Sequence, residues 1–237
     1  MIEDAPLEEL QRLLAMVDIL EPLPPEELER LALLSYPMRL EKREALALDE
    51  DRGTLLLLAS GRVRVHEPST TGGRDLTFSM IEEGTVVAQS GFASRLSRTL
   101  CVEALQPSTM LLLRWEDFEE LVLRNPQVAI RTIRLLSERL AVSEVRLSDL
   151  IRKEVPARLA GLILRLGDHQ GVLIEDRSRM IPTRYTHQQL ASMVGSNREA
   201  VTRALGRLRG VGALEVRDRY IHVTDADALN HLAEIGR

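Results

Sequence analysis

Four polar side chains in the C-terminal part of the sequence have the types and spacing needed to read the edges of DNA bases. They are Arg198, Glu199, Thr202 and Arg203. At about 100° per residue, these positions fall within an arc of roughly 140° near the start of a helix. An arginine can bind guanine O6 and N7 together, a glutamate can accept from cytosine N4, and a threonine methyl can contact thymine. An ordinary amphipathic helix with a solvated charged face is the alternative, and the surrounding elements decide between the two.

The surrounding segment predicts two short helices joined by a tight turn. Thr186 is followed three residues later by Gln189, and Ser196 by Glu199, so each hydroxyl can cap a helix in a capping box. Gly195, between the two boxes, is the residue type that most often ends a helix. Apolar residues mark the inner faces of the two helices: Leu190, Ala191 and Val194, then Val201, Ala204, Leu205 and Leu208. The pattern indicates a helix-turn-helix, whose second helix can enter the major groove.

Charge is distributed unequally along the chain and favours a nucleic-acid partner for its C-terminal part. The 237 residues carry −5, but residues 156–237 hold 12 arginines against 9 acidic residues, which leaves −8 on residues 1–155. A basic segment beside an acidic one is typical of a DNA-binding module attached to another domain. No apolar run approaches a membrane span and the acidic N-terminus lacks the basic start of an export signal, so we expect a cytoplasmic protein without a membrane partner.

The second helix resembles the recognition helix of the cyclic AMP receptor protein/FNR (Crp/Fnr) family of transcription regulators. The resemblance rests on Ser196–Arg203, with Ala191, Gly195 and Val201 at the small-residue, turn and core positions of bacterial helix-turn-helices. It implies a sequence-specific regulator that binds double-stranded DNA as a homodimer and has RNA polymerase as a further partner.

The reading mode of that family implies a role for each polar residue of the segment. Arg198 and Arg203 would contact guanines, and Glu199 the cytosine opposite one of them, in TGTGA-like half-sites of an inverted repeat. The remaining residues of the expected DNA surface are Thr202, Ser196 and Thr186.

Residues 1–125 predict two short helices, over 7–20 and 25–35, followed by a compact set of β-strands. The strands are expected at 54–60, 62–66, 76–81, 85–88, 100–105 and 109–114, because glycines and Pro107 separate short apolar runs there. So many short strands indicate a β-roll or sandwich. Leu57–Val65 and Glu83–Thr85 resemble the strand-glycine-strand segments of the cyclic-nucleotide-binding roll, and Trp115–Phe118 resembles its exit helix.

A long helix is predicted from Asn125-Pro126 to about Ile151. Its apolar residues repeat at intervals of 3, 4, 3, 4 and 3, through Ile133, Leu136, Leu140, Ser143, Leu147 and Leu150. This is the seam of a two-stranded coiled coil, so the helix is expected to join two copies of the chain. A helix buried within one chain is the alternative.

Pro156 cannot continue a helix interior, so Lys153–Pro156 is predicted to be a hinge between domains. A helix over 157–166, a turn over 167–171 and strands near 172–175 and 180–182 are expected to precede the helix-turn-helix. The strands Leu214–Val216 and Tyr220–Val223 then predict a hairpin, the wing of a winged helix. Arg217 and Arg219 at its tip are candidates for phosphate contacts, which position a protein without specifying sequence.

The resemblance also implies an effector site in the roll. Its family holds a cyclic nucleotide with a Gly-Glu pair, which takes the ribose hydroxyl, and an Arg-Ser or Arg-Thr pair, which holds the phosphate. Here Ala88 and Gln89 stand at the first pair, Arg98 and Thr99 at the second, and Ser143 where the long helix offers a hydroxyl to the base. The implied cofactor is therefore cyclic AMP or another small effector, with the absence of an effector as a further alternative.

Two residues of the roll leave a remote alternative, because haem needs an axial His or Cys and His66 and Cys101 are available. An ordinary surface or core role is the commoner one for a lone histidine, and a buried hydrophobe for a lone cysteine.

The sequence as a whole predicts an α+β chain with three parts: an effector-sensing β-roll over 1–125, a dimerisation helix and hinge over 126–155, and a winged helix-turn-helix over 156–237. No phosphate-cradling loop, metal-spaced His or Cys cluster, or nucleophile elbow occurs, so we expect neither a catalytic nor a metal site. A competing hypothesis is a nucleotide-sensing regulatory or scaffold protein whose winged helix binds protein instead of DNA.

Overall fold

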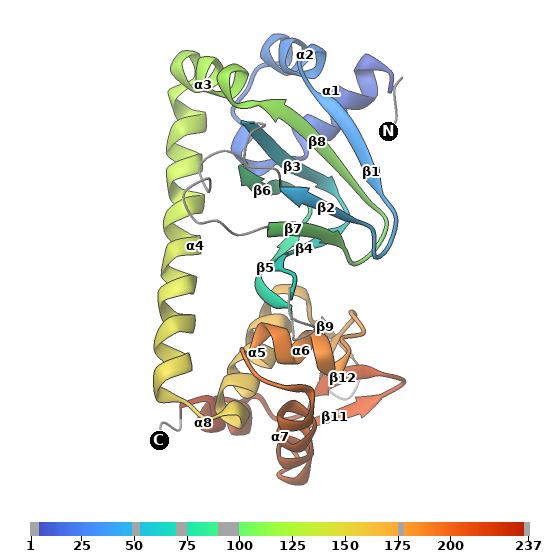
Figure 1. Ribbon diagram of the computed structural model, residues 1–237, viewed down its shortest axis with the longest axis vertical. Helices are drawn as coiled ribbons and strands as arrows, with labels where there is room; N and C mark the ends of the chain where they lie inside the picture. The colour runs from blue at the N-terminus through green and yellow to red at the C-terminus, as the bar shows by residue number, and fades with distance from the viewer. Residues whose placement is uncertain (1–4, 49–52, 70–74, 90–99, 175–177, 235–237) are drawn as a thin grey trace. The chain divides into compact units, whose positions relative to one another are not determined.

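The computed structural model describes residues 5–48, 53–69, 75–89, 100–174 and 178–234 (Figure 1). The chain divides into two compact units, Met1–Arg139 and Leu140–Arg237, and each is described by itself. The helix α4 (Pro126–Arg152) contributes residues to both.

The first unit begins with α1 (Leu7–Ala15), the short 3-10 helix η1 (Asp18–Leu20) and α2 (Pro25–Leu33). The helix predicted over 7–20 therefore ends at Ala15. Two four-stranded antiparallel sheets follow. The first sheet contains, in spatial order, β1 (Tyr36–Leu40), β8 (Ser108–Arg114), β3 (Thr54–Ser60) and β6 (Thr85–Gln89). The second contains β2 (Ala45–Leu48), β7 (Leu100–Ala104), β4 (Arg62–Glu67) and β5 (Leu76–Glu82). The predicted strands are confirmed, and β1 and β2 are additional.

The strand β3 is buried on both faces, which explains its continuous run of leucines. Leu56 and Leu58 belong to an apolar cluster with Val63 and Val102 of the second sheet. Leu55 and Leu57 belong to a different cluster, which contains side chains from α1, η1 and α3 (Trp115–Arg124). Because successive side chains of a strand point to opposite faces, one strand serves both the interior of the roll and its helical cover.

The long helix α4 has 27 residues and leaves its predicted seam in solvent within the single chain. Leu136 and Leu140 are 56% and 61% exposed, and Leu147 is 60% exposed. The seam is therefore not the buried stripe of an intramolecular core helix, and the residue of α4 with a buried side chain is Val128.

The second unit contains α5 (Val155–Gln170), α6 (His187–Met193), α7 (Arg198–Gly210) and α8 (Ala226–Glu234). Its antiparallel sheet has the order β11 (Leu214–Arg217), β12 (Tyr220–Val223), β10 (Arg179–Ile181) and β9 (Val172–Leu173). Its core includes Leu159 and Ile163 of α5, Leu190 of α6, and Leu208 of α7.

The turn predicted over 167–171 is wrong, because α5 continues to Gln170. The Gly167 carbonyl accepts a hydrogen bond from the Gly171 N–H at 3.0 Å. Gly167 is buried, and a Cβ there would lie 3.5 Å from Arg179 and 3.8 Å from Val223. A close packing contact with the sheet therefore outweighs the low helix propensity of glycine.

Candidate DNA-binding interface

The helix-turn-helix begins with the capping box that the sequence predicts. The Thr186 Oγ1 accepts from the Gln189 N–H at 3.1 Å, while the Thr186 N–H donates to Gln189 Oε1 at 2.8 Å. Both bonds satisfy backbone or side-chain groups at the N-terminus of α6, where helical partners are missing. The side chains of Leu190, Ala191 and Val194 are buried, as predicted for the inner face of this helix.

The second predicted capping box is wrong, because α7 starts one residue later than Ser196 requires. Asn197 is the N-cap, and its Oδ1 accepts from the Ala200 N–H at 2.6 Å. Ser196 instead belongs to the turn, where its N–H donates to the Ala191 carbonyl at 2.9 Å. Asparagine is as good an N-cap as serine, so the signal was present at position 197 in the sequence.

Gly195 makes the turn between α6 and α7. Its φ of +61° lies in the left-handed region, which residues other than glycine rarely adopt. A Cβ at this position would also lie 2.8 Å from Leu150 Cδ2 of α4. The glycine therefore meets both a conformational and a packing demand.

The residues predicted to read bases lie together on the exposed side of α7. The side chains of Arg198, Glu199, Thr202 and Arg203 are all exposed, whereas Val201, Ala204, Leu205 and Leu208 on the opposite face are buried. The four polar groups thus share one face of a capped helix, which is the arrangement required for side chains to enter a groove together.

Thr202 also connects α7 to α6 by a hydrogen bond with His187, a residue that the sequence analysis missed. Its hydroxyl donates to the Arg198 carbonyl at 2.8 Å, and His187 Nδ1 lies 2.8 Å from the same oxygen. With the hydroxyl proton committed to Arg198, the His187 Nδ1–H is the donor of the second bond. The methyl of Thr202 remains as its contact group, and the imidazole fixes the start of α6 against α7.

The predicted wing is present as the hairpin of β11 and β12. Asp218 and Arg219 have φ values of +51° and +69°, which is the backbone of a tight two-residue hairpin turn. Arg217 Nε pairs with Glu215 Oε2 at 2.7 Å, so its guanidinium is partly neutralised. Arg219 is exposed at the tip. Beside the wing, the Arg184 guanidinium lies 4.7 Å from the centre of the Tyr220 ring.

The residues expected at the effector site are described only in part. Ala88 is half-buried on β6 opposite Leu56, and Gln89 pairs with Leu55 at the end of the same strand. Arg98 and Thr99 lie outside the described residues. Ser143 is exposed on α4, in the second unit.

Arg139 of α4 is a further cationic residue of the first unit that the sequence analysis did not identify. Its guanidinium donates to the carbonyl of Val86 on β6, and burial lowers the pKa of this group from its ordinary value. A contact between residues 53 positions apart has no signature in local spacing.

His66 lies in a charged cluster of the second sheet of the roll. It is 5% exposed, its Nδ1 lies 3.5 Å from Asp75 and its Nε2 lies 3.7 Å from Glu103. Burial first, and then the Arg64 charge, lower the pKa of this imidazole, while the two carboxylates oppose the shift. Cys101, opposite His66 on β7, is half-buried, which is less than the sequence suggested, and burial raises the pKa of its thiol.

Two other features are absent from the described residues. No group of three His, Cys, Asp or Glu side chains is placed to hold a metal ion. None of the described helices is long and apolar enough to cross a membrane.

Comparisons with known proteins found a matching domain family, a related sequence and similar folds. Residues 157–232 match the model of the Crp-like helix-turn-helix domain. The cyclic AMP receptor protein of Thermus thermophilus is 29% identical over 214 residues, which cover 89% of this chain and 94% of that protein. The fold is similar to that of a CooA mutant from Carboxydothermus hydrogenoformans, with a TM-score of 0.74, 20% identity, and coverage of 85% of this chain and 89% of that one. It is also similar to CLP, the c-di-GMP responsive global regulator of Xanthomonas campestris, with a TM-score of 0.69, 21% identity, and coverage of 84% and 99%.

Proposed function

Because this chain belongs to the Crp/Fnr family of transcription regulators, we propose that it binds an inverted-repeat operator as a homodimer under the control of a small effector. The observation that carries the proposal is the exposed polar face of α7, whose first turn is fixed by the Asn197 cap. Arg198 and Arg203 on this face would bind guanines, and Glu199 a cytosine, in TGTGA-like half-sites.

The exposed seam of α4 supports association of two chains. Its leucines present an apolar stripe at the spacing of a coiled coil, and contact with an identical helix would remove that stripe from water. Two recognition helices related by this symmetry would enter successive major grooves about 34 Å apart, and an inverted repeat follows from the symmetry. The proposed parts are 1–125 for sensing, 126–155 for association and 156–237 for DNA.

The effector proposed for the roll is cyclic AMP or another small molecule. A relative named for cyclic AMP and a structural neighbour described as c-di-GMP responsive support a nucleotide as the effector class. The proposed contacts are Ala88, Gln89, Arg98, Thr99 and Ser143. Gln89 supplies a neutral amide where a carboxylate would take a ribose hydroxyl, so this ligand set differs in charge from that of the resembled family.

The DNA proposal is tested by fluorescence anisotropy on a TGTGA inverted repeat and on a scrambled duplex. Arg203→Ala is expected to cost about 1–3 kcal/mol on the repeat and little on the scrambled duplex, because it removes a base contact. Arg209→Ala is the matched control, since Arg209 is exposed in the last turn of the same helix, beyond the residues proposed to read bases. Equal losses on both duplexes would contradict direct base reading. A scaffold that binds protein through its winged helix would show neither operator preference nor a salt-dependent affinity.

The effector proposal is tested by isothermal titration of the chain with cyclic AMP, followed by anisotropy with and without the nucleotide. Heat of binding and a tighter operator complex would support gating by cyclic AMP, since a ligand shifts DNA affinity only if it prefers one state of the protein. Tight DNA binding without heat would assign regulation to another effector or to the abundance of the protein. Recruitment of RNA polymerase and a cytoplasmic location belong to the same proposal.

A further inference from the structure

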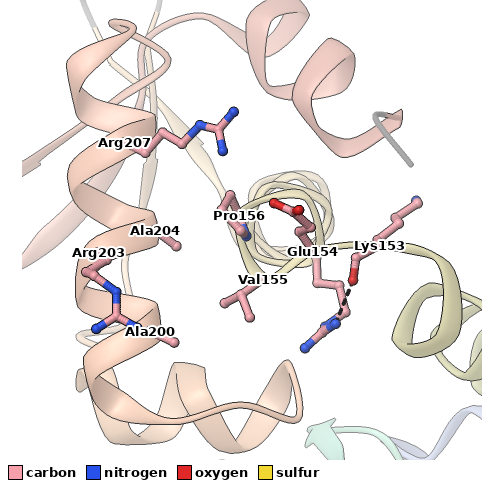
Figure 2. Close-up of a pocket in the computed structure, with 9 residues that line it drawn as sticks. Lys153, Glu154, Val155, Pro156, Ala200, Arg203, Ala204 and Arg207 are labelled. Carbon is pink, nitrogen blue, oxygen red and sulfur yellow. Dashed lines mark hydrogen bonds between the residues drawn. The ribbon is translucent and has the colours of Figure 1, made fainter. Parts of the chain in front are cut away.

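A cleft of about 550 Å³ separates the N-terminus of α5 from the side of α7 (Figure 2). Residues of both helices and of the segment before α5 line it: Lys153, Glu154, Val155, Pro156, Arg158, Ala200, Arg203, Ala204 and Arg207. All of them belong to the second compact unit. The volume falls in the range of small-molecule sites, about 300–1,000 Å³.

The charge of the lining is strongly positive. Lys153, Arg158, Arg203 and Arg207 line the cleft, and Glu154 is the one carboxylate of its lining. Lys153 Nζ already pairs with Asp149 at 2.8 Å, and its ammonium points away from α7 in Figure 2. The Arg158 guanidinium donates to the Val194 carbonyl at 3.0 Å and to the Lys153 carbonyl at 2.7 Å. These two cations are therefore partly occupied by the protein itself.

Arg203 and Arg207 differ from them, because neither makes an ion pair or a hydrogen bond within the described part of the chain. They lie one helical turn apart on α7, and the small side chains of Ala200 and Ala204 leave room between them and α5. Two unpaired guanidiniums on one wall can together bind the several oxygens of a phosphate group.

The opposite wall adds apolar surface and a favourable field. Val155 and Pro156 form it, and α5 begins there, so the positive end of the helix dipole lies at the cleft. Glu154 lies in the segment before α5, and its carboxylate is the lining group whose charge would repel an anion. A ligand with a phosphate group fits the charge and the size of the cleft.

We propose that this cleft is a phosphate-binding site in which Arg203 and Arg207 hold the phosphate oxygens. The proposal rests on the proposed function in one respect, since Arg203 also belongs to the exposed polar face of α7 that is proposed to contact bases. A phosphate in the cleft draws Arg203 away from the bases, so a free polyphosphate competes with the operator. A phosphate of the DNA backbone is the second source of the same chemistry.

The experiment uses the full chain and inorganic pyrophosphate in isothermal titration without DNA. Pyrophosphate is expected to bind, and Arg207→Ala to weaken it about 10- to 100-fold through loss of charged hydrogen bonds. Glu154→Gln is expected to strengthen binding about two- to fivefold, the range of one exposed charge pair. A gain of affinity cannot come from misfolding. Arg209→Ala, outside the cleft, serves as the control.

The same variants in anisotropy identify the source of the phosphate. If pyrophosphate does not bind, but Arg207→Ala weakens the repeat and the scrambled duplex equally and lowers the salt slope by about 1, the backbone of DNA supplies the phosphate. The proposal is overturned if Arg207→Ala and Glu154→Gln behave like Arg209→Ala with both ligands. Failure of the proposed function has a different signature, because the unsubstituted chain would then not distinguish the two duplexes.

Discussion

The cap of the recognition helix gives the sharpest test of the local structure. Replacing Asn197 with alanine removes the Oδ1 acceptor that lies 2.6 Å from the Ala200 N–H and leaves that amide without a partner. Loss of an N-cap of this type costs about 1 kcal/mol, within a range of about 0.5–2. Ser196 caps nothing, so Ser196→Ala should stay within about 0.5 kcal/mol of the unsubstituted chain.

Amide hydrogen exchange measures this difference where it arises. At about 1 kcal/mol, local opening of the first turn of α7 becomes roughly fivefold more frequent in Asn197→Ala, and exchange at Ala200 accelerates by that factor. Asn197→Asp restores an acceptor and places a negative charge at the positive end of the helix, so its exchange should return to the original rate or below. The measurement is made without DNA, which keeps direct contacts to a duplex out of the result. Faster exchange in Ser196→Ala than in Asn197→Ala would refute the assignment of the cap.

Gly195, His66 and Leu147 allow tests of other parts of the structure. Gly195→Ala should destabilise the second unit by about 1–2 kcal/mol in urea unfolding, because φ is +61° there and a Cβ would lie 2.8 Å from Leu150 Cδ2. Asparagine meets the same Leu150 side chain but tolerates a positive φ better, so Gly195→Asn should cost less, and an equal cost would assign the loss to packing instead of backbone strain. The pKa of His66 is lowered from 6.5 by burial, so the unfolded chain takes up this proton first as the pH falls. Stability of the roll should therefore decrease below about pH 6.5, and His66→Gln should remove up to about 1.4 kcal/mol per pH unit from that slope, a result that parallel pH curves would contradict. Leu147→Asp should yield monomers in analytical ultracentrifugation without loss of helix content, since Leu147 is exposed in the single chain; a persistent dimer would exclude the α4 seam.

Short-range patterns were sufficient for much of the fold. Glycine-bounded apolar runs predicted the strands from β3 to β8, and helical spacing predicted α4, α6 and α7. The strand β1 was missed because it contains Pro37, which a strand tolerates at the edge of a sheet, and β1 pairs only with β8 among the described strands. The strand β2 was missed because it alternates alanine and leucine, and alanine is depleted in strands. The helix α8 was also missed, although Asp225 is a residue type that often caps helices, and its Oδ1 accepts from the Ala228 N–H at 2.9 Å.

The exposed polar face of α7 was predictable from the sequence, whereas the contacts that support it were not. Arg198 and Arg203 share a face because of helical periodicity, which local sequence encodes. The bond between His187 and Thr202 spans 15 positions, and Pro156 and Ala204 line the same cleft although they are far apart in the sequence. Such contacts depend on how α5 and α6 pack against α7, and a single sequence does not specify that packing.

The contact between Leu150 and Gly195 limits how this regulator can be re-engineered. Leu150 is a seam residue of α4, and its Cδ2 occupies the space into which a side chain at Gly195 would project. If the seam of α4 were replaced by a designed coiled coil, residue 150 would normally be chosen only for its contribution to the stability of the dimer. The substituted side chain would also pack against the turn between α6 and α7, so residue 150 has to be chosen together with residue 195. A coiled-coil segment can therefore be exchanged freely only before the last heptad of the seam.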